Sequence, residues 1–191
     1  RDIVPEERCR GRTFWNHRQK LVGGMMDGWT VQGEVGWISD RTCLEQYYEK
    51  EWEQNKDQLT GVRSKRTYDN QSISVEANGQ INDFFTQTQW LPRIDHNWLG
   101  EPLLGDQLTW FEHSTAAYAD IGIATTPSTA QLASIFERLP WEEDSLGNAI
   151  SGKGERFTTR QEIAFPIDVA PFKVVPLALG ELAHWGEDIS A

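Results

Sequence analysis

Between Trp29 and Trp37, apolar or small residues alternate with mostly polar ones. One face would carry Trp29, Val31, Gly33, Val35 and Trp37, and the other Thr30, Gln32, Glu34 and Gly36. A period of two predicts a β-strand whose two faces meet different environments. The two tryptophans are eight residues apart, a separation of about 27 Å along a strand. A tilt of about 40° reduces this to a height of roughly 20 Å, close to the apolar band that aromatic girdles border in outer-membrane barrels.

The alternation recurs along the chain and predicts about eight long antiparallel strands. Ile73, Val75 and Ala77, for example, alternate with polar residues between Ser72 and Gln80. The strands are expected at about 10–22, 29–37, 57–68, 71–84, 157–169 and 172–187, with two further long segments within 90–120. A sheet of this kind has one wet face. We therefore expect an all-β, antiparallel fold in which residues 1–191 form one partial domain of a transmembrane β-barrel, with an open or partial sheet.

The expected connections alternate between compact and long. Compact connections are predicted at 23–28, 69–70, 98–106 and 170–171, and long ones at about 39–56 and 125–156. In the first long loop the apolar period changes to three and four, and Thr42 and Glu45 have capping-box spacing, so we expect a short helix. A second helix is expected at 129–139. The connection near 82–85 is the short exception. Long loops on one rim and short turns on the other are typical of outer-membrane barrels.

The charge balance excludes some classes of function. The formal net charge is −11 and the pI is about 4.8, so a nucleic-acid groove is not expected, because phosphate binding needs clustered Lys and Arg. The local basic run Arg63–Arg66 has acidic neighbours and is interpreted as a solvated strand or turn. No apolar run is long enough for a transmembrane helix, whereas a barrel strand shows lipid only every second side chain. The chain starts at Arg1 without an initiator Met, and we expect it to be a segment of a longer protein.

The sequence offers little catalytic or metal-binding chemistry. Four histidines, at positions 17, 96, 113 and 184, lack metal-ligand spacing, and there is no nucleophile elbow or Gly-rich phosphate loop. We therefore expect no enzyme activity, no cofactor and no metal. Cys9 and Cys43 are too few for a disulfide framework. They could pair in an oxidising compartment or be two unrelated small residues.

Taken in order along the chain, five stretches resemble the LPS-assembly outer-membrane protein family, also called the organic solvent tolerance proteins. They are RGRTFWNHRQ, GWISDRTCLEQYYEKEW followed by KDQ, INDFFTQTQWLPRID, GDQLTWFEHS and KVVPLALGELAHWGED. The similarity lies in their sum, since no single one is a catalytic fingerprint. Cys43 stands where the family leads us to expect a larger apolar residue. Because the chain is much shorter than a family member, we expect it to lack the periplasmic jelly-roll, the rest of the barrel and the strands of its lateral gate.

The resemblance implies a place in the cell outer membrane and a role in lipopolysaccharide transport. A protein of this family receives lipopolysaccharide from a periplasmic bridge and passes it into the outer leaflet, with a lipoprotein plug inside the barrel. The sugar part crosses the hydrophilic lumen while the acyl chains pass through the membrane. The stretch that best represents the family contains Trp90, Leu91, Pro92, Arg93, Trp110 and His113. For Arg93 and His113 we expect a role in hydrogen bonding at a buried position or at the rim.

Polarity suggests which side chains would face which solvent. Glu34, Glu76 and Asn78 are expected to face the lumen, and Trp29, Val31, Val35 and Trp37 to face lipid. Two competing interpretations remain. A soluble Trp-rich β-sandwich that binds carbohydrate would also explain nine tryptophans and an acidic surface. A carbohydrate-active enzyme would need two convergent carboxylates in a cleft, whose separation the sequence does not give.

Overall fold

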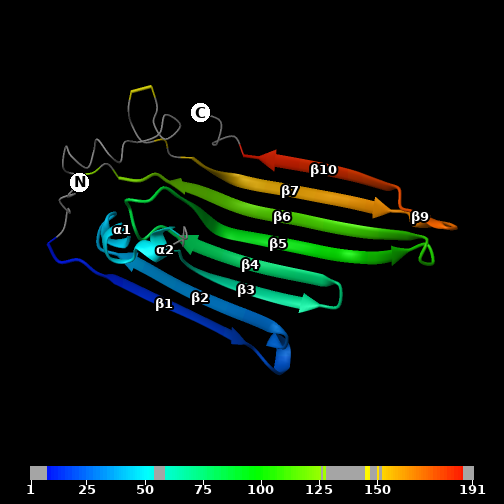
Figure 1. The fold of residues 1–191 in the computed structure, drawn as a ribbon, viewed down its shortest axis with the longest axis horizontal. Helices are drawn as coiled ribbons and strands as arrows, with labels where there is room; N and C mark the ends of the chain where they lie inside the picture. Colours follow the sequence, from blue (N-terminus) through cyan, green and yellow to red (C-terminus); the bar gives the residue numbers. More distant parts are fainter. Residues whose placement is uncertain are drawn as a thin grey trace.

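The computed structural model describes residues 8–53, 59–125, 127, 145–146, 150 and 152–186. These residues form an all-β, antiparallel structure dominated by one eight-stranded sheet of order β1-β2-β3-β4-β5-β6-β7-β10 (Figure 1). Its strands are β1 (Arg12–Lys20), β2 (Trp29–Ile38), β3 (Thr60–Tyr68), β4 (Gln71–Gly79), β5 (Gln87–Leu103), β6 (Leu108–Gly122), β7 (Lys153–Ala164) and β10 (Leu177–Trp185). Strands β1 and β10 lie at opposite edges and, within the described part of the chain, each pairs with one neighbour only. The prediction of an open antiparallel sheet is confirmed.

The connection between the two longest strands was predicted in the wrong place. Residues 98–106 were expected to connect them, but β5 continues to Leu103. A β-bulge between Leu99 and Glu101 absorbs one extra residue, and Gly100 adopts a φ of 80° there. A glycine tolerates this conformation because it has no Cβ. The turn follows with Leu104, Gly105 and Asp106, which also have positive φ.

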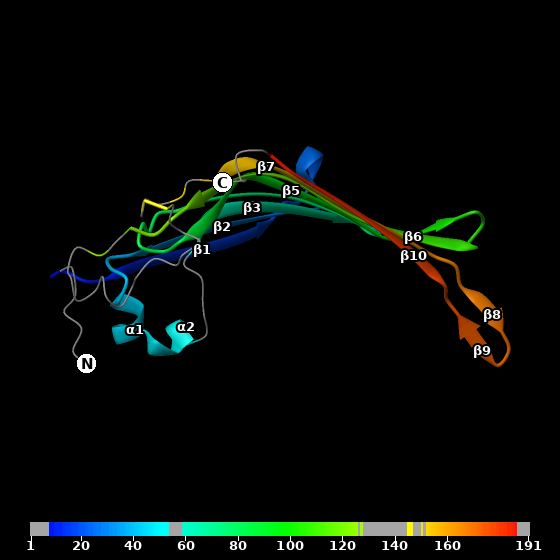
Figure 2. The same cartoon turned by 90° about the horizontal axis from the view of Figure 1, so that it is seen from above.

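The last hairpin is interrupted rather than continuous. Residues 157–169 and 172–187 were predicted as two long strands, but Pro166 and Pro176 have no N–H to donate to a ladder. The eight-stranded sheet therefore ends at Ala164 on β7. A separate pair, β8 (Ile167–Val169) and β9 (Phe172–Val174), carries the predicted turn at 170–171. Figure 2 shows this small hairpin bent away from the end of the main sheet.

The loop after β2 contains two short helices where one was predicted. These are α1 (Cys43–Tyr47) and α2 (Glu49–Glu53), and they lie on one side of the sheet (Figure 2). The predicted capping box does not form, because the hydroxyl of Thr42 donates to Asp40 Oδ1 at 2.8 Å instead of capping the helix. A 3-10 turn, η1 (Gly24–Met26), joins β1 to β2. The helix predicted at 129–139 lies outside the described residues, and β4 ends at Gly79 rather than near residue 84.

The buried hydrophobic cluster of the described residues is small and lies where β2 ends and the helical loop begins. It consists of Ile38, Cys43 and Leu44, against which Tyr48 and the Phe84–Phe85 pair are packed. Large apolar side chains on the sheet itself remain exposed, such as Trp15 at 52% and Leu182 at 73%. Apart from α1 and α2, no described element covers either face of the sheet. What surrounds the two faces therefore decides the stability of the sheet.

Candidate functional site: the two faces of the sheet

The strand register separates the predicted lipid-facing and lumen-facing residues. Because side chains alternate along a strand, Trp29, Val31, Val35 and Trp37 of β2 lie on one face, called here the apolar face. Glu34 lies on the opposite face, the polar face. The register Glu34 to Gly61 to Asn78 places Asn78 on the polar face, and Glu76 is two residues away on the same strand. The two sets of residues thus lie on opposite faces of one sheet, and their assignment to lipid and lumen stays a prediction.

One lateral row shows the character of the apolar face. Cross-strand pairing joins one residue from each of the eight strands, here called the apolar row: Gln19, Val31, Ser64, Val75, Ile94, Ala116, Phe157 and His184. The row contains no Asp, Glu, Lys or Arg, and its members on the six inner strands are small or apolar. The polar residues Gln19 and His184 stand on the two edge strands. A face of this kind is costly to leave in water.

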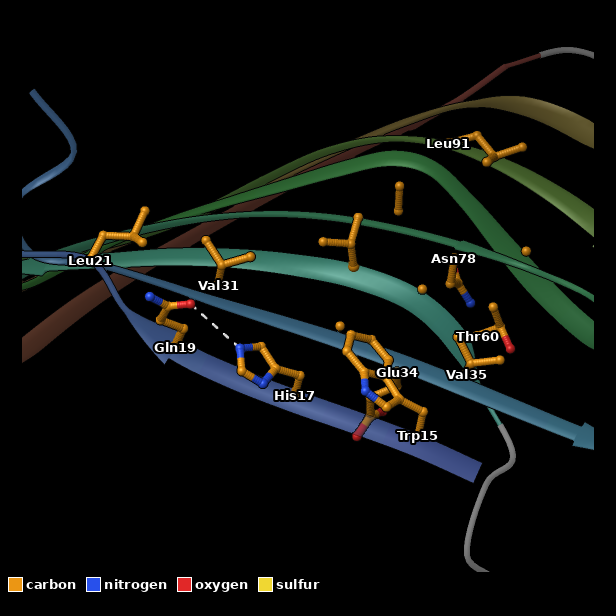
Figure 3. Close-up of a pocket in the computed structure, with 15 residues that line it drawn as sticks. Trp15, His17, Gln19, Leu21, Val31, Glu34, Val35, Thr60, Asn78 and Leu91 are labelled. Carbon is orange, nitrogen blue, oxygen red and sulfur yellow. Dashed lines mark hydrogen bonds between the residues drawn. The ribbon is translucent and has the colours of Figure 1, made fainter. Parts of the chain in front are cut away.

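A shallow, mainly apolar hollow of about 710 Å³ lies on the apolar face over β1 to β4 (Figure 3). Trp15, Val31 and Val35 contribute to its lining, together with Val62 and Leu91. The hollow exists because small residues lie beneath the larger ones. A Cβ at Gly33 would meet the Trp15 ring at 3.0 Å, so the indole covers the glycine. The half-exposed indole of Trp15 gives this hollow an aromatic surface for an apolar group.

The polar face carries a network of charge pairs across β3 to β6. Glu76 lies 3.7 Å from both Arg63 and Arg93, which pair with it on either side. Arg93 also makes the closest contact, 3.0 Å to Asp95. The hydroxyl of Thr115 donates to Asp95 Oδ1 at 2.7 Å. Asp95 is buried, and these two donors compensate its desolvation.

Asn78 and Glu34 have structural partners on this face. The pairing of β4 with β5 stops after Glu76 and Arg93. Beyond that point the side chain of Asn78 accepts from the Trp90 N–H at 2.7 Å and donates to the Thr88 carbonyl at 3.2 Å. It therefore continues the hydrogen bonding where the ladder ends. Glu34 accepts hydrogen bonds from Asn16 and Gln32.

The six residues of the family-like stretch divide between the faces. Arg93 stacks over the Trp90 ring at 5.4 Å on the polar face, and Leu91 lines the hollow on the other. Pro92 lies in a second β-bulge between these positions. Trp110, on the apolar face, donates from Nε1 to Gln161 at 2.8 Å. His113 is half exposed, with Nε2 at 3.7 Å from Asp95. The expected hydrogen-bonding role fits Arg93 better than His113.

Sequence reasoning missed a polar pair on the apolar face. His96 Nδ1 lies 2.7 Å from Glu112 Oε2, and the Glu112 side chain is only 8% exposed. The rings of Trp98 and Trp110, with centroids 5.1 Å apart, lie on the same face toward the end with the short turns. His96 and Glu112 sit on strands joined by a turn whose position was mispredicted, so the sequence could not place them side by side.

A second missed cluster holds the helical loop to the start of β1. Arg10 donates from Nε and Nη2 to Asp40 at 2.8 Å, and Asp40 is 2% exposed. Burial alone would raise the pKa of Asp40, but the hydrogen bonds from Arg10, Thr42 and Ser39 lower it more, so the carboxylate stays charged. The same bond to Asp40 raises the pKa of Arg10. Arg12 contacts Glu51 at 2.5 Å and stacks on Tyr48, so both arginines hold the loop.

Neither cysteine forms a disulfide. Cys9 is exposed and Cys43 is buried, and both are free thiols. Among the described residues, no group of three or more His, Cys, Asp and Glu side chains could hold a metal ion. None of the described helices is long and apolar enough to span a membrane.

The chain was compared with known proteins on three levels. No protein-family model, curated protein or solved structure matches it.

Proposed function

We propose that this chain is part of an outer-membrane translocon that assembles lipopolysaccharide into the outer leaflet. In this proposal the sheet is a segment of a transmembrane β-barrel whose polar face lines the lumen and whose apolar face meets lipid. The observation that carries it is the opposite character of two adjacent rows, one on each face. The apolar row contains no charged residue, whereas the residues one position out of phase on β3 to β5 are Arg63, Glu76 and Arg93.

Strand length and connectivity support a membrane-spanning sheet. A tilted strand crosses a bilayer with roughly nine to eleven residues. The eight strands of the sheet have between 9 and 17 residues. Their short turns lie together at one end, and the helical loop lies at the other (Figure 1). This asymmetry is typical of outer-membrane barrels.

The two unpaired edges support completion by further strands. In lipid each unsatisfied backbone group costs several kcal/mol, so β1 and β10 would need partners in the membrane. In the proposed parent protein these edges pair with additional barrel strands. The small hydrophobic core agrees with this view, because a lipid-facing barrel takes much of its stability from the bilayer rather than from an internal core.

The choice of lipopolysaccharide as cargo rests on the resemblance. The resembling stretches map onto β1, onto the end of β2 with α1 and α2, onto β5 and β6, and onto β10. They therefore include both edge strands and the strands that carry Asp95 and Arg93. The proposed partners are lipopolysaccharide, a lipoprotein plug inside the barrel and the periplasmic bridge that delivers the cargo.

Site-directed labelling tests the assignment of the faces. Val31→Cys and Gln32→Cys are adjacent on β2 and point to opposite faces. Both are made in a background without Cys9 and Cys43, reconstituted into lipid vesicles and treated with a lipid-soluble thiol reagent. We expect Val31→Cys to be labelled and Gln32→Cys to be protected. The reverse pattern would invert the proposed faces. If both variants were labelled equally and the protein did not bind to the vesicles, the membrane assignment would be rejected.

A soluble Trp-rich protein that binds carbohydrate is the second candidate. The hollow with the exposed Trp15 ring favours it, because sugar rings stack on aromatic side chains. Detergent dependence separates the candidates. A soluble binding module stays monomeric without detergent and loses oligosaccharide affinity in Trp15→Ala. The proposed barrel segment aggregates without detergent, since its exposed apolar face seeks a partner.

A further inference from the structure

A row of residues that includes four arginines crosses the polar face through all eight strands. Cross-strand pairing connects the following residues, here called the arginine row: Arg18, Gln32, Arg63, Glu76, Arg93, Ala117, Arg156 and Trp185. At about 4.8 Å between neighbouring strands the row is roughly 34 Å long. Four of its eight members are arginine and one is acidic. The four arginines come from β1, β3, β5 and β7, so the row exists only when the sheet is folded.

The neighbouring rows on the polar face increase the positive charge. On one side, Lys20 and Lys65 belong to a row whose acidic member is Asp95. On the other side, the row through Asn16, Gly61 and Asn78 contains Glu34. The three rows together hold six Lys or Arg against three Asp or Glu, a charge of +3. The whole chain carries −11, so this stripe opposes the charge of the protein that bears it.

Glu76, the one carboxylate in the row, and Asp95 of the neighbouring row do not neutralise its four arginines. Arg93 is engaged by Asp95 at 3.0 Å, and Glu76 is shared between Arg63 and Arg93 at 3.7 Å. Arg156 stacks on the Trp185 ring at 4.2 Å, and no described residue accepts a hydrogen bond from its buried Nε. Arg18 is exposed and, within the described part of the chain, no carboxylate contacts it.

Like charges placed in one row destabilise a sheet unless something compensates them. Solvent screening reduces this cost at exposed positions, but it does not explain why the arginines gather in one row of an acidic chain. Guanidinium groups recognise phosphate and carboxylate through paired hydrogen bonds. Arg18 and Arg63 lie two strands apart and are both exposed. Arg63 is 3.7 Å from Glu76, which is longer than a hydrogen bond, so its guanidinium group can still donate to a ligand. Arg93, fixed by Asp95, would set the electrostatic potential between them and Arg156.

We propose that the arginine row binds the anionic groups of a glycan, that is, phosphate or carboxylate substituents on sugar rings. The inference rests on the proposed function only for the statement that this glycan is the headgroup of a transported lipid. Arg18, Arg63 and Arg156 are the binding residues, and Arg93 is a positioning residue held by its pair with Asp95. A row that extends across the sheet holds an elongated ligand at several points, so its affinity is the sum of modest contacts.

The test uses soluble glycans, so that membrane insertion does not enter the result. The full chain in detergent micelles is titrated with a phosphorylated oligosaccharide without acyl chains, with the same oligosaccharide after phosphatase treatment, and with an oligogalacturonate. We expect each of Arg18→Gln, Arg63→Gln and Arg156→Gln to weaken binding of the phosphorylated glycan about two- to fivefold, and the triple variant about tenfold or more. Added salt should weaken wild-type binding.

Arg66→Gln is the matched control. Arg66 lies on β3 three residues from Arg63, and the register places it on the apolar face. The control removes the same charge and should bind as the wild type does. Arg63→Lys, which keeps the charge, should retain most of the affinity, and circular dichroism confirms that each variant is folded. Phosphatase sensitivity identifies phosphate as the ligand group, and equal binding of the oligogalacturonate extends recognition to carboxylate.

Two results would overturn the proposal. One is an equal loss of affinity in Arg66→Gln and Arg63→Gln, which would reflect net charge alone. The other is the binding of neutral and anionic glycans with the same affinity. The labelling of Val31→Cys and Gln32→Cys is independent of these titrations. Loss of glycan binding in the arginine variants together with failed lipid labelling would retain the anion site and reject the membrane function.

Discussion

The apolar row and the arginine row cross the same eight strands one residue out of phase. The first has Val31, Val75 and Ile94 where the second has Gln32, Glu76 and Arg93. Both rows arise from the same short segments of sequence, so composition does not distinguish them. What separates them is the alternation of side chains along a strand together with the register between strands. A slip of one residue in any strand would exchange its contribution between the faces.

The basic run at 63–66 illustrates the difference. As a sequence it suggests one solvated cluster, but on β3 it is divided between the faces. Arg63 and Lys65 lie on the polar face, while Ser64 and Arg66 lie on the apolar face. Lys65 therefore joins the stripe that Arg63 belongs to, and Arg66 lies opposite it. A charge cluster in a strand has to be counted separately for each face before a ligand is inferred from it.

The largest expected effect comes from placing a charge in the apolar row. In a lipid bilayer Val31→Lys should lower the free energy of unfolding by about 2–4 kcal/mol, the cost of a lysine near the bilayer midplane. Gln32→Lys, next to it on the polar face, should cost less than about 1 kcal/mol, mainly through repulsion from neighbouring arginines. Urea unfolding of both variants in lipid vesicles measures the difference.

The proposed difference between the faces would be contradicted if Gln32→Lys lowered the free energy of unfolding more than Val31→Lys does. Detergent concentration provides a second check, because a soluble sheet would show the same cost for Val31→Lys with or without micelles. A membrane-embedded sheet should show the cost only where the apolar face is in contact with hydrocarbon.

The sequence predicted the faces because their signal is local and repeated. In β2 and β4 a period of two continues over nine or more residues, and its interpretation needs no knowledge of neighbours. The position of the β5–β6 turn was mispredicted because Gly100 and Pro102 were taken as the end of a strand. In the structure Gly100 forms a bulge and Pro102 continues β5. Glycine and proline mark irregular backbone, which a bulge satisfies as well as a turn does.

The lateral rows could not be predicted. Arg18 and Arg156 are far apart in sequence, and they share a row only through six successive registers, each of which depends on turn length and bulges. The contact between Arg10 and Asp40 has the same origin, because it joins residues on either side of the β1–β2 hairpin. Local alternation thus assigns a residue to a face, but only register determines its neighbours on that face.

A smaller effect is expected at the helical loop, which packs at the end of the polar face. The pKa of Asp40 is lowered in the folded protein by hydrogen bonds from Arg10, Thr42 and Ser39, so its contribution to stability is present above the usual Asp pKa and is lost as pH falls through the lowered value. Thr42→Ala removes one donor and should destabilise the loop by about 1 kcal/mol. Since the charged carboxylate of Asp40 loses a hydrogen bond from the Thr42 hydroxyl, the loop of Thr42→Ala should also open at a higher pH than that of the wild type.

The reactivity of Cys43 measures this opening. Cys43 is buried beside Asp40, and in a Cys9→Ser background it is the reporter thiol. The rate of modification by a thiol reagent, corrected for the intrinsic pH dependence of the thiolate with a free-cysteine standard, should rise on acidification, and at a higher pH in Thr42→Ala. An unchanged pH midpoint in Thr42→Ala would mean that the hydroxyl does not support the Asp40 carboxylate.

Two glycines, one on each face, include the smallest expected effect, which is that of Gly33→Ala. A Cβ at Gly33, on the apolar face, would meet the Trp15 ring at 3.0 Å, whereas a Cβ at Gly61, on the polar face, would come within 2.6 Å of the Ala77 carbonyl oxygen. The half-exposed indole can move outward, so Gly33→Ala should change the free energy of unfolding by less than about 0.5 kcal/mol, the steric cost being offset by the lower backbone entropy of the unfolded chain. The backbone at Ala77 is fixed by the ladder, so Gly61→Ala should cost about 1–3 kcal/mol.

Urea unfolding ranks the two variants, and tryptophan fluorescence should shift in Gly33→Ala because the Trp15 ring is displaced. If both variants lost the same stability, the packing on the apolar face would be as rigid as the ladder itself, and the hollow beneath Trp15 would not be adaptable.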